Sequence, residues 1–214
     1  MDAPVVAVRG EAYQEVAPEL ARFTVTAAAR DRDREATLTR LAERAATVRV
    51  LLDTAGPAVT RRETGQLRVW PETKRSGERV VAYHGSVSTT VTVDDFTALG
   101  ELMLRLADHD QVEVAGPWWS LRPDSPAYRE ARHAAIADAL ARAREYAEAL
   151  GARVTALVEL ADTGLSAAPP MMARAAAPRG GAAGAPPELE LDPRPQPVQA
   201  AVEARFTISE PVLG

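Results

Sequence analysis

The amino-acid sequence predicts an α+β fold, with a mostly antiparallel sheet or sheets and three helices. The expected order of elements is ββαββαβα, followed by a strand, a loop and a closing strand. This prediction rests on stretches in which apolar and polar residues alternate, on stretches in which apolar residues recur with the helical period, and on a long proline-rich stretch before the C-terminal strand. One-sided alternation is typical of antiparallel strands that have one face in water.

Alternation is clearest in three segments, residues 20–30, 79–93 and 197–209. Each segment places apolar side chains on one face and mostly polar side chains on the other. In chain order, the expected inward residues are Ala21, Phe23, Val25, Ala27, Val81, Tyr83, Val87, Val91, Val93, Val198, Ala200, Val202, Ala204, Phe206 and Ile208. Weaker strand candidates are residues 5–9, 59–70, 112–121 and 153–160.

Three helices are expected between the strands, and the residues at their ends define them. Gly56 stops the first helix through a left-handed cap, and Asp94 is the expected N-cap of the second. Asp124 or Ser125 begins the third helix, and Gly151 ends it. The expected helical ranges are residues 34–55, 95–108 and, for the third helix, the stretch between the two ends just named.

Each helix is expected to pack through one apolar stripe. The three stripes comprise Leu38, Leu41, Ala45, Val48 and Leu52; Phe96, Leu99, Met103 and Leu106; and Ile136, Leu140, Ala143, Ala147 and Leu150, flanked by Ala135 and Ala139. Small residues let the third helix approach a sheet closely, and its carboxylates lie away from the stripe, so we interpret it as a packing helix. Gly100 in the second helix costs about 1 kcal/mol of helix propensity, which predicts that another backbone passes close to it.

The stretch from Asp162 to Pro197 differs in composition from the rest of the chain. It holds half of the 16 prolines and has almost no hydrophobic periodicity, so we expect a flexible Pro/Ala/Gly-rich loop. Because a strong strand follows it, the loop is expected to be an insertion within a single domain over residues 1–214. Met171 and Met172 are interpreted as incidental loop residues and not as a docking spot.

Composition and motifs exclude several kinds of site. The 214 residues include no cysteine, which removes disulfides, thiolate ligands and cysteine nucleophiles. The three histidines lack metal-ligand spacing, and no dinucleotide, P-loop or G-x-S-x-G motif is present. We therefore expect no catalytic, cofactor-binding or metal residue, and no cofactor.

Charge and hydropathy limit the partners. The net charge is −5, and the arginines near residue 30 alternate with acidic residues, so we expect no nucleic-acid binding. No run of apolar residues is long enough to span a membrane. The N-terminal MDAPVVAVRG lacks the features of a secretory signal, so a cytoplasmic location is expected.

Aromatic residues give the best candidates for an interface or a groove. Trp118 and Trp119 are adjacent, so on a strand their rings point to opposite faces and at most one fills the core. The other ring is a candidate to cap a groove or to meet a partner chain. Trp70 and Tyr83 are the further candidates for such a site.

Four stretches, in this order, resemble a known family. They are VRGEAYQEVAPELARFTV, YHGSVSTTVTVDDFTALGELM, YREARHAAIADALARAREYAEALGARV and VQAAVEARFTI. Together they cover nearly the whole chain and are similar to the SIMPL domain family. That family includes bacterial periplasmic or secreted proteins linked to oxidative stress and a eukaryotic kinase-associated signalling protein.

The resemblance implies an α+β subunit that self-assembles into rings or channel-like oligomers. It transfers no catalytic residue, because the family has no established active site. The leading hypothesis is a non-enzymatic, homo-oligomeric protein that acts as a scaffold or stress-related module. The alternative is a binding module for a small apolar ligand, and a hydrolase built around His84 is the third hypothesis.

Overall fold

The computed structural model describes residues 3–74, 79–162, 189 and 191–212, which form two compact units. The terminal unit contains the residues up to Ala17, those from Pro123 to the end of the sixth strand, and those from Pro195 onward. The central unit contains Pro18–Arg122 and a short segment before Arg194. Most of the stretch from Asp162 to Pro197, including Met171 and Met172, lies outside the described residues. That the whole chain behaves as one domain stays a prediction.

Two antiparallel sheets and three helices confirm the expected α+β class and the expected order of elements. The elements are β1 (Val5–Val16), β2 (Leu20–Asp31), α1 (Arg34–Thr54), a 3-10 turn (Gly56–Ala58), β3 (Val59–Thr73), β4 (Val80–Val93), α2 (Phe96–Ala107), β5 (Val112–Ser120), α3 (Pro126–Ala149), β6 (Val154–Asp162) and β7 (Gln196–Ile208).

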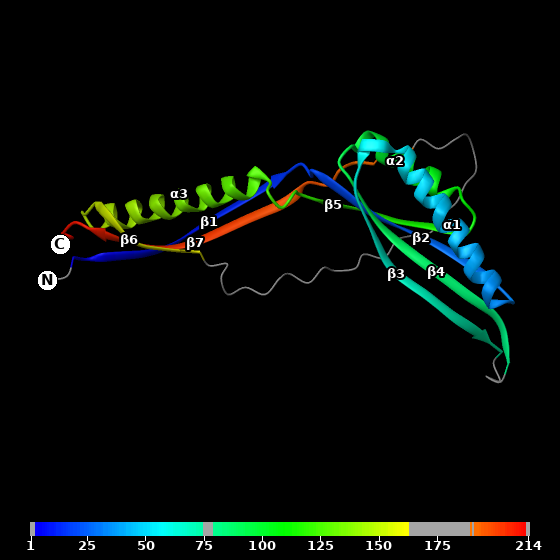
Figure 1. Ribbon diagram of the computed structural model, residues 1–214. Helices are drawn as coiled ribbons and strands as arrows, with labels where there is room; N and C mark the ends of the chain where they lie inside the picture. Colours follow the sequence, from blue (N-terminus) through cyan, green and yellow to red (C-terminus); the bar gives the residue numbers. More distant parts are fainter. Residues whose placement is uncertain (1–2, 75–78, 163–188, 190, 213–214) are drawn as a thin grey trace. The chain divides into compact units, whose positions relative to one another are not determined.

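The central unit is a four-stranded antiparallel sheet in the order β3-β4-β2-β5. With α1 after β2 and α2 after β4, it has the connectivity of a ferredoxin-like βαββαβ unit. Both helices lie on one face of this sheet (Figure 1). The core beneath them is built around Phe23, Val91 and Leu106, all fully buried.

The alternation predicted the buried face of these strands at most positions. The apolar odd-numbered residues of β2 are buried, as are Val91 and Val93 of β4. Near the start of β4 the prediction was wrong, because Ala82 is buried whereas Val81 and Tyr83 are half-buried.

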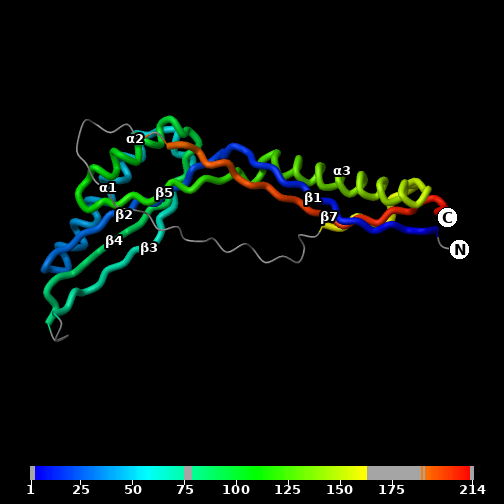
Figure 2. Tube along the Cα trace, turned by 180° about the vertical axis from the view of Figure 1, so that it is seen from behind, coloured from blue at the N-terminus to red at the C-terminus, as the bar shows by residue number. Residues whose placement is uncertain are grey.

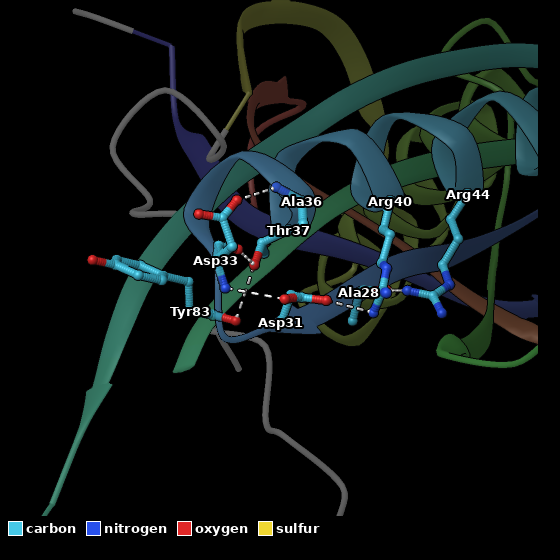
Figure 3. A network of polar contacts seen from close by, with 8 residues as sticks. All are labelled: Ala28, Asp31, Asp33, Ala36, Thr37, Arg40, Arg44 and Tyr83. Atoms are coloured by element: carbon cyan, nitrogen blue, oxygen red, sulfur yellow. Dashed lines mark hydrogen bonds and ion pairs between the residues drawn. The ribbon is translucent and has the colours of Figure 1, made fainter. Parts of the chain in front are cut away.

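The start of α1 is held to the sheet by a network of polar contacts (Figure 3). Asp33 caps the helix by accepting a hydrogen bond of 2.8 Å from the Ala36 N–H. The buried Thr37 hydroxyl donates to the Asp33 carbonyl at 2.8 Å. Asp31 pairs with Arg40 at 2.7 Å. The hydrogen bond from the Asp33 N–H is the main cause that lowers the Asp31 pKa, and Arg40 adds to it.

The terminal unit is a three-stranded antiparallel sheet in the order β1-β7-β6, with α3 along one face (Figures 1 and 2). The first and the last strand of the chain pair in this unit, where Val5 lies opposite Thr207. The α3 helix packs mainly on β1 and β7. At Gly10 the two backbones come so close that an added Cβ would collide with the Ala135 carbonyl and lie 2.5 Å from the Ala139 nitrogen.

This close approach corrects the predicted stripe of α3. The buried positions are alanines spaced four residues apart: Ala127, Ala131, Ala135, Ala139, Ala143 and Ala147. Ile136 is 38% exposed and Leu150 is 39% exposed, so these two larger residues lie on the flank. Only small side chains fit between α3 and β1, and the hydrophobic pattern therefore placed the stripe slightly off its true centre.

The helix ends largely follow the sequence. Ser125 caps α3, and Gly151 follows it with a φ of +67°. The N-cap of α2 is Asp95 and not Asp94, because the Asp95 carboxylate accepts from the Thr97 N–H at 3.0 Å. At Gly100 a Cβ would collide with the Leu189 carbonyl, which confirms that a second backbone passes beside this helix.

Candidate functional site

The face of the central sheet opposite the helices carries a row of hydroxyl groups. Ser88 and Thr90 of β4 pair with Thr26 and Thr24 of β2 and are half-buried. This agrees with the interpretation of the SVSTTVT segment as the polar face of a strand. Next to this row, beyond Ser86 on β4, lies a group of charged and aromatic side chains near one end of the sheet.

Five side chains from three strands form what we call the cross-strand cluster: Arg30, Arg68, Trp70, Glu72 and His84. The rings of Trp70 and His84 are stacked with centroids 5.3 Å apart, and the Arg68 guanidinium lies 5.3 Å from the Trp70 ring centroid. Glu72 Oε2 contacts His84 Nε2 and Arg30 Nε, each at 2.8 Å. The strand register brings these groups together, because His84 pairs with Arg30 on one side and with Trp70 on the other.

The cluster keeps its carboxylate charged. The Arg30 hydrogen bond, with a second one from His84, lowers the pKa of Glu72 from 4.5 to about 2. The same contact raises the pKa of Arg30. A carboxylate with this pKa is a poor proton donor at neutral pH. His84, around which a hydrolase site was considered, contacts Glu72 and Trp70 and not a hydroxyl nucleophile among the described residues.

The four aromatic candidates lie at two separate places in the central unit. Trp119 is half-buried on the core face and packs edge-on against Phe96 at 4.9 Å, whereas Trp118 on the opposite face is 52% exposed. The prediction that their rings point to opposite faces is confirmed. Trp70 is 40% exposed within the cross-strand cluster. Tyr83 is half-buried, and its ring points away from the network at the start of α1 (Figure 3).

The strand register shows which of these residues the fold separates. Tyr83 pairs with Asp31 at one end of β2, and Trp119 pairs with Ala21 at the other end. At about 3.3 Å per residue, these positions are roughly 33 Å apart along the strand. Trp70 and Tyr83 therefore belong to one end of the sheet, and the Trp118–Trp119 pair belongs to the other.

A groove that sequence reasoning did not find lies between α1 and β3, on the helix side of the central sheet. Its volume is about 320 Å³, at the lower end of the range for small-molecule sites. Val25 and Val87 of the sheet and Val48 of α1 are among its apolar lining, and Arg49 and Arg62 are among its charged lining. The sequence contained one signal for this groove. Ala45 is the only small residue in the expected stripe of α1, and its short side chain leaves space between the helix and the sheet.

The terminal sheet has two edges of different character. On β1 the outward residues include Arg9 and Glu11, and the Asp138 carboxylate accepts a hydrogen bond of 2.9 Å from the Glu11 backbone N–H. On β6 the apolar residues Leu157 and Val158 are each 55% exposed. Charges and capped amides are common ways to protect a strand edge, and β6 has little of this protection.

Among the described residues, no group of three or more His, Cys, Asp or Glu side chains is placed to hold a metal ion. Within the same part of the chain, no helix is both long and apolar enough to cross a membrane.

Comparison with known families gives one match. The family model SIMPL, described as "Protein of unknown function (DUF541)", matches residues 6–206. No curated protein matches the chain. The family match spans both sheets and all three helices, in agreement with the resemblance found in the four sequence stretches. The chain belongs to the SIMPL family.

Proposed function

We propose that this protein is non-enzymatic and works by self-assembly, as a scaffold or stress-related module, with β6 as the strand through which copies associate. The observation that carries this proposal is the exposed apolar edge of the terminal sheet. Leu157, Val158 and Leu160 of β6 are all substantially exposed, and Glu159 is the only charged residue among them.

An edge strand presents a row of backbone N–H and C=O groups that can pair with another strand. Burying large aliphatic side chains at the same place would add a hydrophobic contribution of about 25 cal/mol per Å² of apolar surface. The other edge, β1, is less suited to pairing, because Asp138 occupies the Glu11 N–H and three of its six outward residues, Arg9, Glu11 and Glu15, are charged. The difference between the two edges supports β6 as the contact strand.

Antiparallel pairing of two β6 strands is self-complementary and would give a two-fold dimer with a continuous six-stranded sheet. A second self-complementary surface is needed for larger assemblies. The 15-residue β3 strand suits this role, since it forms an edge of the central sheet and nearly all of its residues are exposed.

The proposal is tested by size-exclusion chromatography with light scattering on the full chain and on two valine variants. Val158→Lys places a charge at the β6 edge, and Val5→Lys makes the same change at an exposed position of β1. We expect an oligomer for the wild type and for Val5→Lys, and a smaller mass for Val158→Lys, because burial of an unpaired lysine opposes pairing. A monomeric wild type, or an unchanged mass for Val158→Lys, would contradict the proposal.

A further inference from the structure

The groove between α1 and β3 results from how α1 sits on the central sheet. The helix packs on β2 and β4, and β3 extends beyond it as the edge strand (Figure 1). Val25 and Val48 beneath the groove are almost fully buried, whereas Ala45 and Val87 are half-buried. The groove therefore offers a space of about 320 Å³ over aliphatic side chains of the sheet and of α1.

The charged residues that line the groove are not balanced. The Arg62 guanidinium forms an ion pair with Asp53 at 2.6 Å. Arg49, on α1, is exposed and makes no hydrogen bond or ion pair with any described residue. Two hydroxyls, from Thr64 and Thr89, add uncharged polar groups to the lining. The groove thus combines aliphatic side chains with polar groups and one guanidinium, that of Arg49, which has no charged partner among the described residues.

We propose that this groove binds a small amphiphilic monocarboxylate. Its short aliphatic chain lies on the aliphatic side chains of the groove, and its carboxylate pairs with Arg49. A guanidinium recognises a carboxylate through two parallel hydrogen bonds, which makes arginine well suited to this role. A single guanidinium without a charged partner among the described residues favours a monoanion over a dianion, because Arg62 already has Asp53 as its partner. The site is built only from central-unit residues and differs from the aromatic positions expected from the sequence.

Sodium octanoate is the probe for this proposal, titrated into the full chain by calorimetry, with 1-octanol as the neutral probe of the same chain length. Octanoate is expected to bind more tightly than 1-octanol. Arg49→Gln should raise the Kd of octanoate by about tenfold, since it removes a charge-assisted hydrogen-bonded pair. The matched control is Arg34→Gln, which removes an exposed arginine from the first turn of the same helix, away from the groove, and should leave the Kd unchanged.

A second variant tests the apolar part of the site. Ala45→Leu fills the groove from α1 and should abolish octanoate binding, with circular dichroism to show that the variant is folded. The assembly variant Val158→Lys should bind octanoate like the wild type, so the two proposals are tested independently. Absence of octanoate binding to the wild type, equal affinity for octanoate and 1-octanol, or an unchanged Kd in Arg49→Gln would overturn the inference.

Discussion

Glu72 shows how a single side chain holds an edge strand to the sheet. It lies on β3 and contacts Arg30 of β2 and His84 of β4, so its carboxylate joins three strands. Hydrogen bonds from Arg30 and then from His84 lower the pKa of Glu72 to about 2. The ionised carboxylate is therefore more stable in the folded state than in the unfolded state. The partners are substantially exposed, and salt is expected to weaken the contact.

The Glu72 pKa leads to a prediction about acid stability. Because the folded-state pKa lies below the unfolded value of 4.5, the stabilisation is complete above that pH and is lost as the pH falls toward about 2. We expect Glu72→Gln to lower the Tm most at neutral pH, with the difference from the wild type shrinking below about pH 4.5. Thermal unfolding followed by circular dichroism across this pH range measures the effect.

Glu63→Gln is the control, since it removes one negative charge from the same exposed strand without touching the cross-strand cluster. A difference in Tm between wild type and Glu72→Gln that stays constant down to about pH 2 would show that the contact with Arg30 does not stabilise the fold.

Some features of the candidate sites could not be predicted from the sequence, because they depend on strand register. His84 was considered from the sequence as the centre of a hydrolase site, but its partner Glu72 lies 12 positions earlier on a strand whose pairing the sequence did not specify. A bulge between Thr64 and Leu67 shifts that pairing further. Local patterns do not encode such shifts.

Among the elements, α3 and β1 pack so closely that their backbones nearly touch at Gly10. Gly10 lies under the Ala135–Ala139 turn, where even one methyl group has no room. The alanine stripe of α3 packs directly against Gly10. Both sides of this contact are limited to small residues, because the two backbones are so close.

Gly10→Ala is therefore expected to destabilise the terminal unit by about 1–3 kcal/mol or more, since the added Cβ forces the helix and the strand apart. Urea denaturation measures this change. Ala7→Val enlarges an outward-facing residue of the same strand and should alter the free energy of unfolding by less than about 0.5 kcal/mol. Equal effects of the two changes would mean that the close contact between β1 and α3 is not a determinant of stability.

Two strands with one clearly apolar face, β2 and β7, were predicted well, and the strands exposed on both faces were not. The alternation in β2 and β7 marked the buried side chains at most positions. By contrast, β3 and β6 were only weak candidates, since neither has a face that is consistently apolar. An edge strand that packs against no helix leaves little periodic signal, although β6 supplies the surface on which the proposed function depends.

For the whole molecule, the division into two units has a testable consequence. The central unit has its own hydrophobic core, and most of it is continuous in the sequence, from Pro18 to Arg122. We expect a fragment of residues 18–122 to fold alone and to unfold cooperatively on heating, because a core of this size can stabilise a domain. Circular dichroism of the fragment tests this expectation. A fragment without cooperative unfolding would support the single domain expected from the sequence.

The two proposals assign different roles to the two units. In these proposals the terminal unit contributes an exposed strand edge for association between copies, and the central unit contributes a groove lined by Arg49, which has no partner among the described residues. Neither proposed role needs a catalytic residue.

Hydrogen–deuterium exchange of the β6 amides, measured at low and at high protein concentration, tests self-assembly through β6 most directly. Pairing of β6 between copies should protect its outward amides at high concentration, and the protection should disappear on dilution and in Val158→Lys. The amides of β1 should exchange alike at both concentrations. Exchange in β6 that does not depend on concentration would contradict the account.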